Sequence, residues 1–164
     1  SIEIASELAV SLGLGDEISY LQGDFERLEC LDDGGHDGLV SFSCIRYVPD
    51  PLAALHQARR VVKPGGRVVV DFPNRFCPWF KHLKTRFGVN VHFEDRHFSA
   101  REVRDMFTDA GLESVRFTKL LFTPTITPAA LLPAFKLLDL LGERTPGLKE
   151  TAAIIMCSGQ VPSA

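Results

Sequence analysis

The sequence lacks several features that define common protein classes. None of its apolar runs approaches the roughly 20 residues that a membrane-spanning helix needs. Its four cysteines form no CxxC pair, which argues against a zinc site and against a disulfide framework. A net charge of -3 leaves no excess of positive charge for a general nucleic-acid surface. These absences favour a cytoplasmic protein with reduced thiols and without a nucleic-acid partner.

What is present describes one ordinary globular domain. A length of 164 residues fits a single domain. The content of 45% hydrophobic and 24% charged residues is typical of a folded globular chain. We find no internal repeat, low-complexity tract or clear linker that would divide the chain, so its function has to be sought in local motifs.

The stretch from His36 to Phe72 begins with a strand signal and a helix signal. The apolar run from Gly38 to Phe42 is too short for a helix and suits a buried strand. Asp50 is a good N-cap, and Pro51 suits the first position of a helix. Apolar residues at helical spacing then continue for about three turns. The sequence therefore predicts a strand followed by an amphipathic helix.

The same stretch ends with a turn and a second strand. The turn Lys63-Pro64-Gly65-Gly66 stops the helix, because Gly65 can adopt the positive φ that a type II turn requires. Arg67 to Phe72 is rich in valine and reads as another buried strand. A strand, a helix and a strand of these lengths form a right-handed βαβ unit with parallel strands.

Similar signals predict the remaining elements. Ser99 and Glu102 form a capping box that starts a helix, and Gly111 ends it. In the first helix, Leu8 and Leu12 fall on one apolar face. We expect further helices at Ile2–Leu12 and Pro128–Leu141, and further strands at Ile18–Gln22, Ser114–Phe122 and Thr151–Ser158.

This order of motifs resembles the second half of a class I S-adenosylmethionine-dependent methyltransferase of the small-molecule branch. The most telling pieces are Val48–Pro51, Lys63–Gly66, and the strand followed by Gly23-Asp24-Phe25-Glu26-Arg27-Leu28. The resemblance covers most of the chain. It implies an α/β, Rossmann-like methyltransferase sheet that is N-terminally truncated and mostly parallel, with an antiparallel final strand.

The resemblance also implies which parts of the family's domain are absent. The family begins with a strand, a glycine-rich turn, a helix and a second strand, and none of these precedes Ser1. We therefore expect residues 1–164 to be a partial methyltransferase domain with half of the cofactor site. Strands that would pair with the missing ones have exposed edges, which invite pairing with another chain, so a homo-oligomer is one expectation. Residues 74–98 and 123–150 are expected to be substrate-side insertions.

Four residues are candidates for binding S-adenosylmethionine. In the resembling family, the acid that matches Asp24 accepts a hydrogen bond from the adenine amino group, and the next residue, here Phe25, packs on the ring. Ser43 and Cys44 stand where the family lines the cofactor, largely with backbone groups. Three of the assignments have structural alternatives: a helix N-cap for Asp24, a core phenylalanine for Phe25 and a small buried hydrophobe for Cys44.

Three residues are substrate-side candidates. Arg46 and Tyr47 follow the cofactor-side segment, and many relatives carry histidine where Tyr47 stands, so we assign no catalytic residue. Trp79 lies among the interleaved basic and aromatic residues of segment 75–87. Such a segment either lies on an anionic membrane, covers a lipid-like substrate or packs its aromatic residues on the core.

Three acidic or polar features receive weaker interpretations. Asp37 starts a strand at the end opposite the ligand crevice, so we read it as structural. Asp71, late in a strand, either reaches the crevice or caps a neighbouring turn. The polar residues between His92 and His97 lack metal-site spacing, so we expect no metal.

The resemblance implies methyl transfer from S-adenosylmethionine to a small or lipid-like acceptor. Direct displacement on an activated sulfonium requires alignment and a dry site, which explains why no obligatory nucleophile or metal is evident. Two alternatives remain open. One is a non-catalytic, methyltransferase-like binding module. The other is a nucleotide-cofactor oxidoreductase, whose usual pattern lacks the Lys63–Gly66 turn and the Val48–Pro51 segment.

Overall fold

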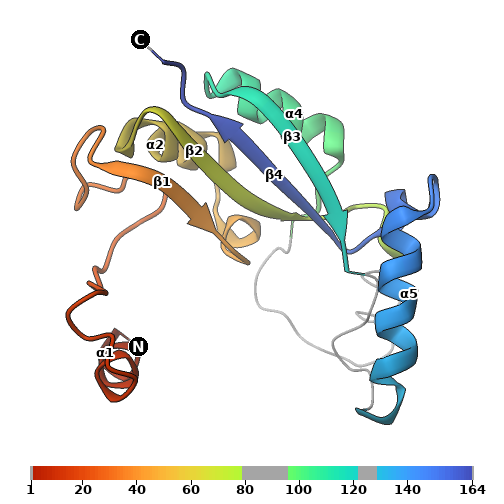
Figure 1. Cartoon of the computed structure of the whole chain (residues 1–164). Coiled ribbons are helices and arrows are strands. Elements are labelled where there is room, and N and C mark those ends of the chain that lie inside the picture. The colour runs from red at the N-terminus through yellow and green to blue at the C-terminus, as the bar shows by residue number, and fades with distance from the viewer. Residues whose placement is uncertain (1, 79–95, 122–128, 164) are drawn as a thin grey trace.

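A computed structural model of the chain describes residues 2–78, 96–121 and 129–163. Its centre is a four-stranded sheet with the strand order β1-β2-β4-β3 (Figure 1). β1 and β2 pair in parallel, while β4 is antiparallel to both of its neighbours. Three strands therefore point one way and the last strand opposes them, as predicted. The bounds are β1 (His36–Ser41), β2 (Val62–Pro73), β3 (Glu113–Leu120) and β4 (Ile154–Gln160).

Two helices, α2 (Pro51–Val61) and α4 (Ala100–Asp109), cover one face of the sheet (Figure 1). Both begin at the predicted caps. The carboxylate of Asp50 accepts hydrogen bonds at 3.0 and 3.1 Å from two backbone N–H groups in the first turn of α2. Ser99 and Glu102 form the reciprocal capping box of α4. Side chains near the helix start thus decide where each helix begins.

The hydrophobic core lies between this face and the two helices. Val70 and Phe72 of β2 point into it with no exposed surface. The Phe72 ring meets the rings of Phe98 and Phe107 edge-on, at centroid distances of 5.2 and 6.1 Å. Because side chains alternate along a strand, Asp71 points to the opposite face of the sheet.

The residues of the predicted turn, Lys63–Gly66, belong to the first part of β2, which begins directly after α2. Gly65 has a φ of +81°, and its N–H donates to the carbonyl of Val161 at 2.9 Å. A Cβ atom on Gly66 would lie 2.5 Å from Cγ1 of Val62 and 2.6 Å from the carbonyl oxygen of Asp37. Gly65 therefore provides a left-handed conformation, whereas Gly66 provides space.

Two strand predictions need correction. Residues 18–24 form no strand, and Ile18 and Leu21 are exposed. A strand requires a neighbour for its backbone groups, and none of the described strands lies beside this segment. The second correction concerns the strand expected to be buried at Gly38–Phe42: Val40 of β1 and Phe42, directly after it, are each 61% exposed. β1 is an edge strand, and the helices cover just one of its faces.

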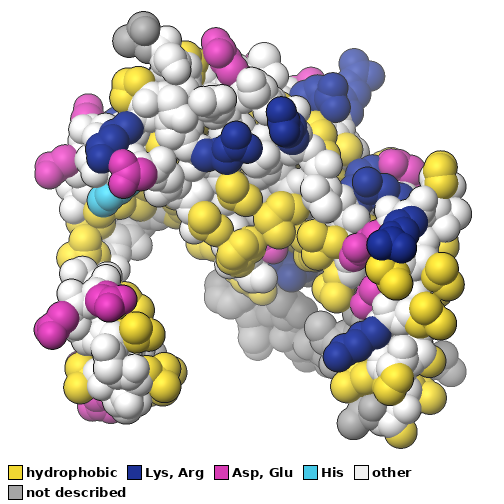
Figure 2. Space-filling model, in the orientation of Figure 1, with side chains coloured by type: hydrophobic (Ala, Val, Ile, Leu, Met, Phe, Trp, Pro, Cys, Tyr) yellow, Lys and Arg dark blue, Asp and Glu magenta, His cyan; other side chains and the backbone are white. Residues whose placement is uncertain are grey.

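The helices α1 (Ile2–Ser11) and α5 (Leu132–Arg144) stand away from the helix-covered core (Figure 1). Leu8 and Leu12, expected on one apolar face, are 58% and 65% exposed, and α1 buries Ala9 instead. Figure 2 shows apolar side chains on the surfaces of both helices. In the described part of the chain, no helix has the length and apolar content needed to cross a membrane. In α5 the exposed leucines are Leu132, Leu137, Leu138, Leu140 and Leu141.

Candidate functional site

The parallel pairing of β1 and β2 brings their carboxyl ends together. In open α/β sheets, ligands bind outside the carboxyl ends of the strands. At this edge the chain leaves β1 and turns into the short helix η1 (Ile45–Tyr47). We call residues 41–44 the β1 turn. The candidates Ser43 and Cys44 lie in this turn, and Arg46 and Tyr47 lie in η1 directly after it.

Asp71 holds the β1 turn in an unusual conformation. Ser43 has a φ of +55°, a left-handed conformation that costs a non-glycine residue about 1–3 kcal/mol. The backbone N–H of Ser43 donates to Oδ1 of Asp71 at 2.6 Å, and Asp71 is only 6% exposed. A hydrogen bond to a carboxylate is stronger than one to a neutral acceptor and offsets this cost. Of the two roles considered for Asp71, capping a neighbouring turn is the one observed.

Cys44 is exposed, so it is not the small buried hydrophobe that was considered as an alternative. Partial desolvation raises the pKa of its thiol, and the Asp71 carboxylate raises it further, while a hydrogen bond with Ser41 opposes both effects. The thiol is therefore protonated at neutral pH and is a weak nucleophile.

The substrate-side candidates differ in how the structure places them. Within η1, the guanidinium carbon of Arg46 lies 5.7 Å from the ring centre of Tyr47, within cation–π range. Tyr47 is 53% exposed, and the buried Ile45 anchors the same short helix in the core. Trp79 lies outside the described residues, so its role remains a prediction from the sequence.

Asp24 and Phe25 lie on a turn rather than at the end of a strand. Oδ1 of Asp24 accepts the N–H of Glu26 at 2.9 Å, so Asp24 caps a turn and not the helix that the alternative reading expected. Phe25 is half-buried and packs against the hydrophobic core, as in the core alternative. The Asp24 carboxylate is nevertheless exposed and has capacity for more hydrogen bonds. Contact with adenine therefore remains a prediction for both residues.

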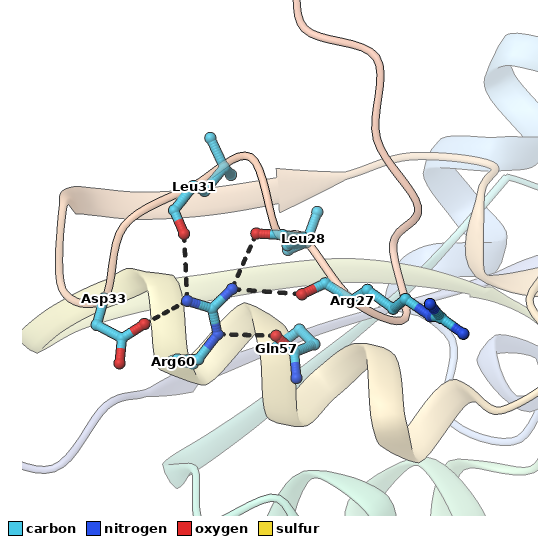
Figure 3. A network of polar contacts seen from close by, with 6 residues as sticks. All are labelled: Arg27, Leu28, Leu31, Asp33, Gln57 and Arg60. Atoms are coloured by element: carbon cyan, nitrogen blue, oxygen red, sulfur yellow. Dashed lines mark hydrogen bonds and ion pairs between the residues drawn. The ribbon is translucent and has the colours of Figure 1, made fainter.

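One arginine of α2 anchors the loop that follows Asp24. Figure 3 shows the Arg60 guanidinium enclosed by this loop and by α2. Its five N–H groups all donate, which matches the full donor capacity of a guanidinium. The sequence pattern marks this position only as a polar site on the helix. The acceptors are the carbonyls of Arg27, Leu28 and Leu31, the carboxylate of Asp33 and the amide oxygen of Gln57.

A second contact connects the Asp24 turn to the segment before α2. Oε1 of Glu26 accepts the N–H of Asp50 at 2.5 Å. The guanidinium of Arg96 donates to the carbonyl of Pro49, in the same segment before α2, at 3.0 Å. The Val48–Pro51 segment, prominent in the sequence, thus connects the Asp24 turn, η1 and α2.

Asn74, at the end of β2, has an organising role that the sequence did not reveal. Its side chain is fully buried, and Nδ2 donates to the carbonyls of Glu150 and Ala152 at 2.8 and 2.7 Å. Its Oδ1 accepts the N–H of Phe76 at 3.1 Å. An asparagine after a strand is typical of a turn, so no local signal distinguishes this buried junction.

Arg75 belongs to the basic and aromatic segment in sequence, but it stabilises the start of α4. Its guanidinium lies 2.7 Å from Oε1 of Glu102. Desolvation alone would raise the pKa of Glu102, but hydrogen bonds from Ser99 and the ion pair with Arg75 lower it overall. Arg75 therefore has a structural partner, which argues against counting it toward a membrane surface.

Comparison with known proteins extends these observations. Residues 1–70 match the sequence profile of the methyltransferase domain family. Demethylmenaquinone methyltransferase of Bacillus velezensis is 29% identical over 131 residues, which cover 68% of this chain and 56% of that protein. Ubiquinone/menaquinone biosynthesis C-methyltransferase UbiE of Pectobacterium carotovorum is 29% identical over 139 residues, covering 73% and 55%. The chain thus spans about half the length of these relatives.

A solved structure shares the fold. An S-adenosylmethionine-dependent methyltransferase from Thermotoga maritima superposes with a TM-score of 0.64 at 21% identity, covering 91% of this chain and 68% of that one. At this identity the likeness defines the α/β, Rossmann-like methyltransferase fold. The sequence matches are also to methyltransferases, so the chain is similar to proteins of this class in both sequence and fold. The α/β, Rossmann-like fold expected from the sequence is confirmed.

Proposed function

We propose that this chain serves S-adenosylmethionine-dependent methyl transfer to a lipid-like acceptor of the quinone type. The observation that carries the proposal is the match of 131 residues to a demethylmenaquinone methyltransferase. The fold supports it, because two of the cofactor candidates, Ser43 and Cys44, follow the carboxyl end of β1, and open α/β sheets bind ligands outside such strand ends. In this proposal the protein is cytoplasmic.

The candidate residues have the chemistry that S-adenosylmethionine requires. The exposed Asp24 carboxylate can accept a hydrogen bond from the adenine amino group, and the half-buried Phe25 ring offers an apolar surface for the base. Ser43 and Cys44 of the β1 turn are exposed residues. When bound, the cofactor supplies a methyl group already activated by its sulfonium, so these residues need only hold and align it. The protonated Cys44 thiol competes poorly for that methyl group.

On the acceptor side, we propose that Arg46 and Tyr47 contact the polar ring of the substrate. The exposed leucines of α5 would contact its apolar part, which supports residues 123–150 as a substrate-side insertion. Residues 74–98, with Trp79, are proposed as the other insertion. Peripheral membrane contact and self-association through the β1 edge belong to the same proposal, since the acceptor is lipid-like and β1 is an edge strand.

The first test is cofactor binding. The isotopically labelled chain is titrated with S-adenosylmethionine and S-adenosylhomocysteine to millimolar concentration while its amide NMR signals are followed. We expect shifts at Asp24, Ser43 and Cys44. Asp24→Ala should weaken binding by about 1–3 kcal/mol, the scale of a lost hydrogen bond to a charged group. Asp16→Ala, which removes another exposed acid, is the matched control. If both variants bind the cofactor with equal affinity, Asp24 has only a capping role.

The second test is methyl transfer. The chain is incubated with methyl-labelled S-adenosylmethionine and a demethylmenaquinone, and the extracted lipid is analysed for label and for the added methyl group. Labelled product supports the proposal. Cofactor binding without transfer to any quinone-type acceptor would favour a non-catalytic binding module.

A further inference from the structure

We infer that Asp71 is a positioning residue for the cofactor side of the site. Its carboxylate fixes the backbone of the β1 turn through the N–H of Ser43. The inference rests on the proposed function and deepens it, because it names a residue that would control cofactor affinity without touching the cofactor.

The sheet register places Asp71 where it can serve the turn. Ser41 is the last residue of β1 to pair with β2, and its partner is Val70. Asp71 is therefore one residue beyond the last β1 pair, level with the start of the turn. β2 continues past this point while β1 turns away. The Ser43 N–H, which has left the strand ladder, donates to the side chain of Asp71 at 2.6 Å.

The burial of this acid is unusual. Asp71 is only 6% exposed, on the face of the sheet opposite to Val70 and Phe72. A carboxylate in such a place is unfavourable unless hydrogen bonds compensate it. The N–H of Ser43 supplies one such bond across 28 positions of sequence. The hydrogen bond to the β1 turn therefore explains why an aspartate stands within the apolar run of β2.

Ser43 is the residue that most needs this support. It adopts a φ of +55° without being glycine, so contacts must maintain the conformation. A ligand that binds backbone groups of the turn gains affinity when the turn is already ordered, since less conformational freedom is lost on binding. Asp71 would thus act by preorganisation.

The test compares Asp71→Ala with Asp71→Asn, whose amide oxygen can still accept the N–H of Ser43. Asp37→Ala removes an acid at the opposite end of β1 and is the matched control. In wild type, the Ser43 amide should exchange slowly, because its N–H donates to Asp71. We expect Asp71→Ala to speed that exchange and to raise the Kd for S-adenosylhomocysteine about tenfold or more. Asp71→Asn and Asp37→Ala should stay within about threefold of wild type.

A double-mutant cycle with Ser43→Gly separates positioning from general stability. Glycine adopts the left-handed conformation without help, so Asp71→Ala should cost less affinity in the Ser43→Gly background than in wild type. If Asp71→Ala fails to fold alone, its effect is read in that background and compared with Asp71→Asn. A lower melting temperature with an unchanged Kd would show a purely structural residue and overturn the inference.

The proposed function can fail independently. If wild type binds neither S-adenosylmethionine nor S-adenosylhomocysteine, the cofactor assignment fails, and the Ser43 amide then decides whether Asp71 positions the turn. Exchange that quickens in Asp71→Ala but not in Asp71→Asn supports the positioning role. An unaltered Ser43 amide overturns it.

Discussion

The helices α2 and α4 differ from α1 and α5 in what they cover, although all four carry apolar residues at helical spacing. α2 and α4 begin at side-chain caps and place Leu55 and Phe107 in the core without exposed surface. α5 begins without a side-chain cap hydrogen bond, and Leu138 on it is 39% exposed. Helical spacing thus predicts that a helix forms, whereas the packing partner decides whether its apolar side chains stabilise the fold.

The largest effect should come from the covered helices. Phe107→Ala removes a fully buried ring that lies edge-on to Phe72, so we expect a loss of about 3–5 kcal/mol in the free energy of unfolding. Urea denaturation followed by circular dichroism measures it. A loss below about 1 kcal/mol would show that α4 and the sheet pack loosely, and the contrast with α5 would disappear.

A smaller but more local effect is expected at Arg60. Arg60→Lys keeps the charge but cannot reproduce five directed hydrogen bonds, so we expect a loss of about 1–3 kcal/mol. Amide exchange should quicken between Leu28 and Asp33. Arg59→Lys, at an exposed position of the same helix, is the control and should change neither quantity. Similar exchange in both variants would mean that the loop is held by its apolar contacts instead.

The capping box of α4 should give a pH-dependent effect. The pKa of Glu102 is lowered in the folded state, so its charge contributes stability above the unfolded pKa, and this contribution disappears as pH falls through the folded pKa. Glu102→Gln should therefore destabilise the protein at neutral pH, with the difference closing in acid. Melting temperatures across this range test it. A constant difference would assign the effect to geometry rather than to charge.

The smallest effect is expected on α5. Leu138→Ala should change the free energy of unfolding by less than about 0.5 kcal/mol, because the side chain already contacts water. The same denaturation experiment applies. A loss comparable to that of Phe107→Ala would show that another surface covers α5 in solution, and dilution should then weaken the effect if that surface belongs to a second copy.

Predictions of secondary structure succeeded where the residues that determine an element lie close together in the sequence. The cap at Asp50, the capping box at Ser99 and the positive φ of Gly65 each depend on neighbours within four residues. The strand predicted at Ile18–Gln22 failed because its alternation specifies a strand only when a partner exists. Local signals thus located most helices and turns, but not the pairing between distant segments.

The site shows the same limit. Resemblance located Ser43 and Cys44, yet the acid that holds their turn stands 28 positions away. Arg60 reaches across 27 to 33 positions to the loop after Asp24. Both contacts depend on how β1 and α2 sit against β2, which no sequence pattern of a few residues encodes.

The turn at Lys63–Gly66 affects how the chain tolerates substitution. Any side chain at position 66 would collide with the carbonyl oxygens of Asp37 and Lys63, at 2.6 and 2.9 Å, and backbone atoms cannot move aside as a flexible side chain can. In a saturation library, position 66 should accept glycine alone, although it lies at the end of β2 opposite Asp71. The requirement is steric, so a chain that had lost methyl transfer would still need this glycine. The Lys63–Gly66 motif therefore helps to identify the fold, but its presence does not indicate whether the protein is an active enzyme.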